Sequence, residues 1–214
     1  MEPILPNVNA TTATTKEVSR RAYLGFTVFD LVHIACAITL IVFASNERPI
    51  DALEFAESLV EIIFSLLLMT FIAVLAKHNH NRQQFNTLYT FAWLVATASL
   101  LSSSVFFVPE ILMGTWSATE VLSLTLESVA LALGLVTFAL TMVALLLSRN
   151  AAKWKRAMIA PLIAVMVFAS AQCACSFALI KEIPILIVEC VKDLVPFVPA
   201  IMGLIMVFEK PKEA

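Results

Sequence analysis

The sequence is poor in charged residues. Asp, Glu, Lys and Arg make up 14% of its 214 residues, whereas soluble domains carry about 25%. Hydrophobic residues make up 60% of the chain, and a soluble globule of this length would have too little polar surface to cover them. The composition excludes a soluble enzyme, a disordered tail and a secreted disulfide scaffold, and it predicts an all-α, polytopic membrane protein.

Residue types that mark other functions are also scarce. The net charge of −2 gives no reason to expect nucleic-acid binding. Three histidines are too few for a membrane metalloenzyme, so we expect no metal, no cofactor and no enzymatic activity. All four cysteines (Cys36, Cys173, Cys175 and Cys190) fall within apolar runs, and we expect reduced thiols that act as small apolar fillers. Only four glycines are present, and none forms a GxxxG packing motif.

Long apolar runs between short polar segments predict six membrane-spanning helices. About 20 apolar residues cross the roughly 30 Å hydrocarbon core, and a helix satisfies every backbone amide where water is absent. The predicted spans are residues 22–44, 55–76, 87–108, 121–147, 158–180 and 184–208. They form three consecutive hairpins in a transmembrane domain, 22–208, between a polar N-terminal segment, 1–21, and a short tail, 209–214.

The distribution of positive charge predicts the orientation. Eleven of the 14 Lys and Arg residues flank the spans on the side of both termini, and only Arg48 and Lys181 lie on the other side. The positive-inside rule therefore places the N- and C-termini in the cytoplasm. A glycan on the acceptor Asn9 would show that this topology is inverted. We expect Trp116 and Trp154, near span ends, to lie at the membrane–water interfaces.

Glutamates recur at matched places in the three hairpins. Glu57, Glu127 and Glu189 each stand early in the second helix of a hairpin and are followed by Ser, Ser and Cys. Each glutamate is separated by a similar number of residues from the first charged residue at the inner end of its helix. Because helices rise 1.5 Å per residue, the three glutamates are expected at the same depth in the membrane. The interpretation is a threefold internal repeat, as in some transporters. The alternative is chance similarity between leucine-rich helices.

Five ionisable side chains fall deeper within the predicted spans, in their outer part: Glu61, Glu127, Glu189, Lys192 and Asp193. Each costs about 2.5–3.5 kcal/mol on insertion scales, and such groups usually face a bundle interior or a water-filled cavity. Glu189, Lys192 and Asp193 share one helix face, where Lys192 is neutralised within its own helix. The functional interpretation is an acidic outer vestibule that binds a cation or a proton. The alternatives are structural ion pairing and the preference of acids for helix N-termini.

Two further pairs of residues bear on mechanism. Asp30 and His33, three apart in the first span, form either a proton relay or a hydrogen-bonded pair that fixes packing. Pro196 and Pro199 each remove an amide donor and predict a kink or interruption, a candidate gate, in the last span. Hydroxyl and amide side chains in the third and fifth spans more often serve packing than a pore, and among them Gln172 needs the most partners.

The favoured hypothesis is a small membrane channel or transporter that moves a cation or a proton-coupled solute through an acidic outer vestibule. The alternative is a non-catalytic accessory or assembly subunit of a larger membrane complex, because all predicted loops are short and no soluble domain is available to hold a substrate. An intramembrane enzyme would need a nucleophile–base pair or a metal cluster, which the sequence lacks. Expected partners are the lipid bilayer, a cation or proton, and a second copy of the chain or a larger membrane complex.

Overall fold

The computed structural model describes residues 8–47, 52–77, 82–106 and 118–208, and all regular structure in these ranges is helical. The helices are α1 (Val8–Glu47), α2 (Ala52–Lys77), α3 (Arg82–Phe106), α5 (Ala118–Leu146), α6 (Ala151–Leu179), α7 (Ile183–Leu194) and α8 (Phe197–Phe208). Trp116, the tail at 209–214 and the side chain of Glu57 lie outside the described residues.

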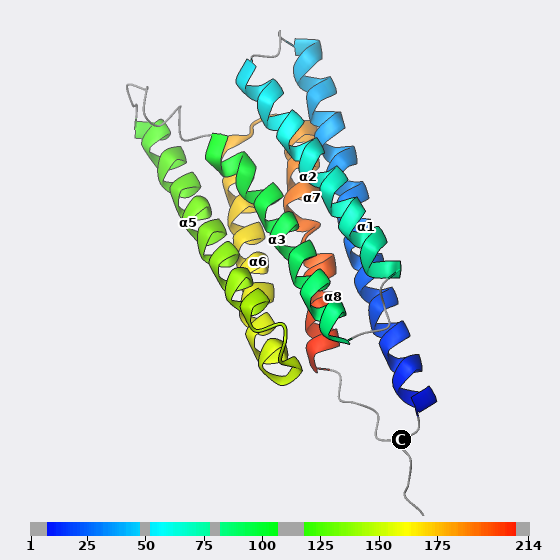
Figure 1. Ribbon diagram of the computed structural model, residues 1–214. Coiled ribbons are helices and arrows are strands. Elements are labelled where there is room, and N and C mark those ends of the chain that lie inside the picture. The colour runs from blue at the N-terminus through cyan, green and yellow to red at the C-terminus, as the bar shows by residue number, and fades with distance from the viewer. Residues whose placement is uncertain (1–7, 48–51, 78–81, 107–117, 209–214) are drawn as a thin grey trace, which may run out of the picture.

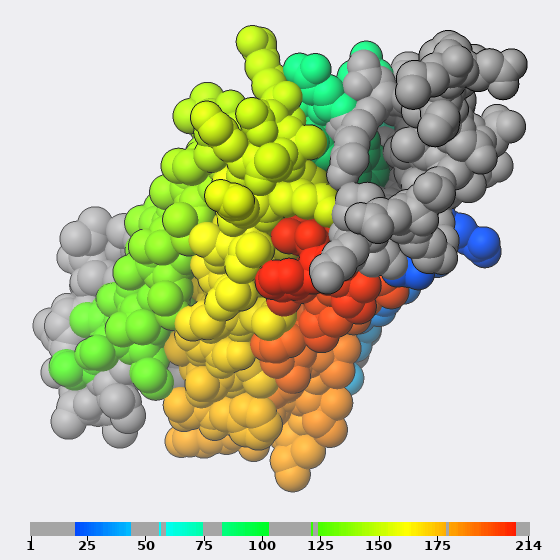
Figure 2. Space-filling view, turned by 90° about the horizontal axis from the view of Figure 1, so that it is seen from below, coloured from blue at the N-terminus to red at the C-terminus, as the bar shows by residue number. Residues whose placement is uncertain are grey.

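The helices run alternately up and down in one bundle (Figure 1). Neighbours along the chain pack together from α1 to α3 and from α5 to α7, and α3 also packs on α5. The consecutive helices α7 and α8 follow one path between α1 and α6, and α8 contacts both of these helices. Figure 2 shows α8 lying against α6 at the end of the bundle where α8 finishes. The last segment of the chain thus closes the bundle against the first.

Four of the predicted spans meet the length and hydropathy expected of a membrane-crossing helix. These stretches are Arg20–Phe43, Leu124–Leu146, Ala151–Ala178 and Ile183–Phe208. In α2 the apolar stretch is shorter, Leu59–Val74, and α3 does not meet the criterion. The helix α3 instead buries polar side chains such as Asn86, Thr90 and Thr97 inside the bundle. The four long apolar helices are compatible with a multi-pass membrane protein.

The outer surface of the bundle is apolar along its helices. Large aliphatic side chains on α1, α2, α5 and α7, such as Leu31, Leu66, Leu135 and Ile187, are more than half exposed. Threonine hydroxyls beside them donate to the carbonyl four residues earlier in the same helix, as Thr70 does to Leu66 at 2.9 Å. Satisfying a hydroxyl within its own helix removes the need for water at that position. This surface chemistry suits a lipid environment.

An aromatic cluster joins α1, α3 and α6. Phe26, Trp93 and Trp154 surround Tyr89, with ring centroids of neighbouring pairs 5.1–6.5 Å apart in edge-on geometry. Trp154 is buried and its indole N–H donates to the Thr90 hydroxyl at 2.8 Å. Trp154, in the first turn of α6, therefore packs its ring among the helices and does not expose it on the outer surface of the bundle.

Close helix approach depends on two glycines, although no GxxxG motif is present. A Cβ built on Gly203 of α8 would lie 2.9 Å from Leu162 of α6 and would also meet the Tyr89 hydroxyl. A Cβ on Gly134 of α5 would lie 2.6 Å from Leu101 of α3. A larger residue would require the ends of these neighbouring side chains to move, so glycine lets them pack closely against the helix backbone.

Candidate functional site

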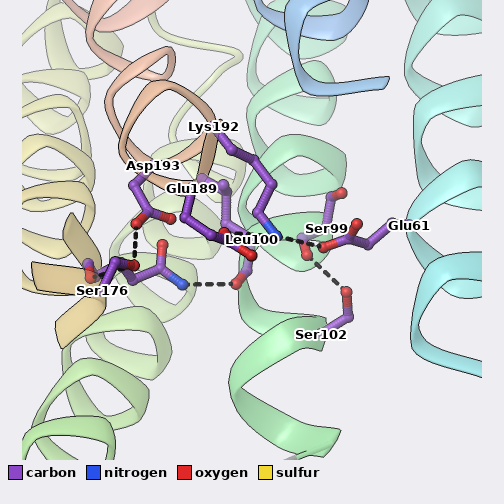
Figure 3. A network of polar contacts seen from close by, with 9 residues as sticks. Glu61, Ser99, Leu100, Ser102, Ser176, Glu189, Lys192 and Asp193 are labelled. Atoms are coloured by element: carbon purple, nitrogen blue, oxygen red, sulfur yellow. Dashed lines mark hydrogen bonds and ion pairs between the residues drawn. The ribbon is translucent and has the colours of Figure 1, made fainter. Parts of the chain in front are cut away.

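The site is built on α7, whose sequence separates an apolar face from a charged one. Pro184, in the first turn, favours helix initiation because it lacks an amide proton that would have no intrahelical acceptor there. Ile183, Ile187, Val191 and Leu194 lie three or four residues apart and are exposed on the outside of the bundle. The remaining face carries Glu189, Lys192 and Asp193 and turns toward α2, α3 and α6 (Figure 3).

Lys192 lies between two carboxylates from different helices. Its Nζ atom is 3.2 Å from Oε2 of Glu189, on the same helix, and 3.5 Å from Oε1 of Glu61, on α2. The side chains of Lys192 and Glu61 are only 12% and 6% exposed, and that of Glu189 is 22% exposed. Ion pairs this well shielded interact strongly, and losing either partner would leave an uncompensated charge inside the bundle.

Asp193 extends the network to α6. The Ser176 hydroxyl lies 2.8 Å from Oδ2 of Asp193 and 3.2 Å from the Gln172 carbonyl, so its single proton can serve either acceptor. The Gln172 amide in turn donates to the Leu100 carbonyl of α3 at 3.4 Å. Figure 3 shows these contacts and the Glu61–Lys192 pair side by side. Four helices thus contribute to one region of polar contacts, α3 through the Leu100 backbone carbonyl, and we call this region the charged network.

Two oxygen atoms in this region have no hydrogen-bond partner among the described residues. They are the hydroxyl oxygen of Ser99, a residue that is 3% exposed, and the side-chain carbonyl oxygen of Gln172. Figure 3 places Ser99 beside Glu61 and Lys192. A buried polar atom without a partner costs about 1–3 kcal/mol. Oxygens of this kind next to carboxylates are suitable ligands for a hard cation or for bound water.

The helix breaks directly after the charged residues. The helix α7 ends at Leu194, Val195 and Pro196 form a turn, and α8 begins at Phe197. Pro196 has no amide proton to donate to the Lys192 carbonyl, and Pro199 has none for Val195. Val198 donates to the Val195 carbonyl instead, at 3.1 Å. The break therefore falls at the two predicted prolines and begins two residues after Asp193.

Asp30 and His33 lie on α1 and are both buried. Neither carboxylate oxygen of Asp30 has a hydrogen-bond partner among the described residues, so no hydrogen bond joins it to His33. Ser65 of α2 lies near the Asp30 carboxyl. His33 lies within electrostatic range of Lys192. The structure therefore associates His33, more than Asp30, with the charged network.

The predicted acidic residues do not all reach this network. Glu61, Glu189, Lys192 and Asp193 are brought together by α2 and α7. Glu127 is half-buried on α5, and its charge acts on Cys175 of α6, which also feels Asp193. The threefold repeat cannot be followed at Glu57, whose side chain lies outside the described residues.

Sequence reasoning missed the roles of two serines. The hydroxyl side chains of the third and fifth predicted spans are expected to serve packing, yet two of them, Ser99 and Ser176, lie beside Glu61 and Asp193 respectively. The spacing of Ser176 and Gln172, four residues apart on one face of α6, is the available signal. It becomes informative only when the facing helix is known.

No known protein family, curated protein or solved structure matches this chain. Among the described residues, no group of three or more His, Cys, Asp or Glu side chains is arranged to hold a metal ion. The geometry of the charged network is therefore the basis for any functional assignment.

Proposed function

We propose that this protein is a small membrane transporter or channel that moves a proton or a cation through the charged network. In this proposal all six predicted spans cross the membrane, both termini are cytoplasmic, and α7 begins on the outer side. The observation that carries the proposal is the Glu61–Lys192–Glu189 cluster with Asp193 beside it. Glu61 and Asp193 are buried, and the side chains of Lys192 and Glu189 are 12% and 22% exposed.

The charges of these four side chains do not balance. Three carboxylates stand against one ammonium group, which leaves two negative charges when all four are ionised. An excess of negative charge among largely buried side chains favours the binding of a counter-charge. Bound protons or a bound cation would supply it. A cluster of side chains that binds and releases a proton or a cation is what a transport pathway for that ion requires.

The break between α7 and α8 supplies an element that can change shape. Interrupted helices beside intramembrane charges are a recurring design in transporters, where unwound backbone lines the ion site. The turn at Val195 and Pro196 lies next to Asp193, and only Ser176 of α6 donates a short hydrogen bond to the Asp193 carboxylate among the described contacts. Movement of α7 about this turn would alter the contacts of Glu189, Lys192 and Asp193 together.

One observation favours the alternative, an accessory subunit of a larger membrane complex. Lys192 is already neutralised by two carboxylates, which is how a purely structural network would hold it. Such a subunit would act without catalysis or transport, and its apolar outer surface would meet partner subunits instead of lipid.

Flux measurements on the full chain in liposomes distinguish a transporter or channel from an accessory subunit. We expect proton or monovalent-cation flux above that of empty liposomes, reduced about tenfold or more, equivalent to roughly 1.4 kcal/mol, by Glu189→Gln and by Asp193→Asn. The matched control is Glu182→Gln, because Glu182 is exposed at the start of α7 and its side chain makes no cap hydrogen bond. Absence of flux from correctly folded, monodisperse protein would reject transport and favour the accessory role.

A further inference from the structure

Asp30 of α1 is 1% exposed, and neither of its carboxylate oxygens has a hydrogen-bond partner among the described residues. The other buried acids of the described ranges have polar partners. Glu61 lies 3.5 Å from the Lys192 ammonium group, and the Ser176 hydroxyl lies 2.8 Å from the Asp193 carboxylate. An ionised carboxylate in an apolar interior is far more costly than the neutral acid unless a cation or hydrogen bonds compensate it. The surroundings of Asp30 therefore favour the acid with a proton on one oxygen.

Aromatic side chains lie beside Asp30 on its own helix. Phe26, one turn earlier, packs edge-on against Trp93 of α3 with ring centroids 5.1 Å apart. Phe29, the preceding residue, is buried. Asp30 itself stands near the middle of the apolar stretch Arg20–Phe43. Its carboxyl thus lies deep within a predicted span, among groups that offer no counter-charge.

The interrupted last span packs on α1 close to Asp30. A Cβ built on Gly25 would lie 3.2 Å from the Cα atom of Pro199, so α8 touches the backbone of α1 there. Gly25 is five positions before Asp30, about 7.5 Å along the helix axis. Helix α8 begins directly after the turn at Val195 and Pro196. A movement at this turn would therefore change the packing of α1 next to the Asp30 carboxyl.

We propose that the transported ion is a proton and that Asp30 carries it through the middle of the membrane. The inference rests on the proposed transport function and names its substrate. One O–H bond forms at the Asp30 carboxylate when a proton arrives from one side of the membrane, and the same bond breaks when the proton leaves to the other side. A proton needs a single oxygen, whereas hard metal cations take about six or more oxygen ligands. A lone carboxyl next to Phe26 and Phe29 suits the first and not the second.

Other titratable groups lie in the same bundle, so the pH dependence of flux alone would not identify Asp30. Helices α2, α3, α7 and α8 pack on α1, and α8 contains no titratable residue. The groups inside the bundle on the remaining elements are His33 and Cys36 of α1, Glu61 of α2, Tyr89 of α3, and Glu189, Cys190, Lys192 and Asp193 of α7. The test must therefore detect the proton on Asp30 itself.

Infrared spectroscopy of the full chain in nanodiscs at neutral pH detects this proton. A protonated carboxyl without hydrogen bonds absorbs at the high-frequency end of the C=O stretching range. We expect such a band in the wild type, its loss in Asp30→Asn and its retention in Asp193→Asn. Asp51→Asn combined with Asp193→Asn leaves Asp30 as the last aspartate of the sequence. A shift of the band in this double variant after labelling with ¹³C-aspartate assigns it to Asp30 without altering that residue. Absence of the band, or a band that does not shift, overturns the proposal.

Flux in proteoliposomes identifies the ion. Under a pH gradient we expect an internal pH change that stays the same when N-methylglucamine replaces Na⁺ and K⁺. Asp30→Asn, which keeps the size of the side chain but has no acidic proton, should lower this proton flux about tenfold or more. Thr27→Val is the matched control and should leave the flux unchanged. Thr27 is also on α1, and its hydroxyl donates within its own helix to the Tyr23 carbonyl at 2.8 Å.

The outcomes separate this inference from the transport function on which it rests. Flux of Na⁺ or K⁺ without proton movement overturns the proton assignment and leaves transport standing. Proton flux that is unchanged in folded Asp30→Asn overturns the role of Asp30 and likewise leaves transport standing. Absence of any flux from the folded wild-type protein rejects both.

Discussion

Lys192 is held between carboxylates from two helices, Glu189 on its own helix α7 and Glu61 on α2. The three-residue separation of Glu189 and Lys192 predicts their ion pair, which is observed at 3.2 Å. The second partner, Glu61, could not be predicted, because its contact with Lys192 depends on how α2 and α7 are rotated about their own axes. The same reason explains why the contact of Ser176 with Asp193 could not be predicted.

The shielded position of Lys192 leads to a prediction about stability. Lys192→Met leaves Glu61 and Glu189 without their shared cation, so we expect a loss of about 3–5 kcal/mol in the free energy of unfolding. Reversible unfolding by sodium dodecyl sulfate in mixed micelles, followed by circular dichroism, measures it.

Two further variants test whether the loss of stability comes from the uncompensated carboxylates. Glu61→Gln combined with Lys192→Met should recover part of the loss, because one of the two uncompensated carboxylates is then neutral. Lys181→Met should change stability by no more than about 0.5 kcal/mol, since Lys181 is exposed between α6 and α7. A loss under about 1 kcal/mol for Lys192→Met, the range of an exposed pair, would contradict a shielded ion pair.

At the scale of helices, the composition of the sequence predicted that the elements are helical, but it did not predict where each helix begins. Helix α1 runs from Val8, so the polar residues before the first predicted span continue its helix. A change from apolar to polar side chains does not show where a helix starts, because a helical turn has the same backbone conformation and hydrogen bonds in water and in the core. The break after Leu194 was predictable, since two missing amide protons are a covalent property of Pro196 and Pro199.

The break gives a prediction about flux. Pro196→Ala combined with Pro199→Ala restores two amide donors and favours a continuous helix from α7 into α8. If the turn at Val195 and Pro196 is the moving element, we expect flux in proteoliposomes to fall about tenfold while stability is retained or raised.

Pro161→Ala is the matched control for this pair. Pro161 lies inside α6, away from the break, and is likewise buried. It should leave flux unchanged. Equal flux in the double variant and the wild type would show that the interrupted helix takes no part in transport.

At the scale of the whole molecule, the sequence predicted an all-helical bundle, and the structure adds how it closes. Hydropathy alone could not show that α8 packs between α1 and α6, nor that the less apolar α3 occupies the interior. Helix α3 does not qualify as an apolar span because it contains polar side chains, several of which, such as Asn86, Thr90 and Thr97, are buried inside the bundle. The place of α3 inside the bundle therefore follows from its packing against neighbouring helices, which the hydropathy of its sequence does not reveal.

The positive-inside orientation gives a prediction that labelling can check. In a background with the four native cysteines replaced by serine, Asn150→Cys should react with a membrane-impermeant maleimide only from the cytoplasmic side. Glu182→Cys should react only from the opposite side, because α6 separates the two exposed positions. The reverse pattern in intact cells and inverted vesicles would show that the termini face outward. Labelling of both positions from one side would refute the crossing by α6.

The Glu61–Lys192 pair has a consequence for how the chain is synthesised and inserted. A helix carrying Glu189, Lys192 and Asp193 together is a poor candidate for entering lipid alone, whereas the threonines on α1 and α2 already bond within their own helices. This charged segment follows α2 and α6 along the chain, so its partners are synthesised before it. Under the proposed topology, α7 would therefore dock its charged face against helices that have already entered the bilayer.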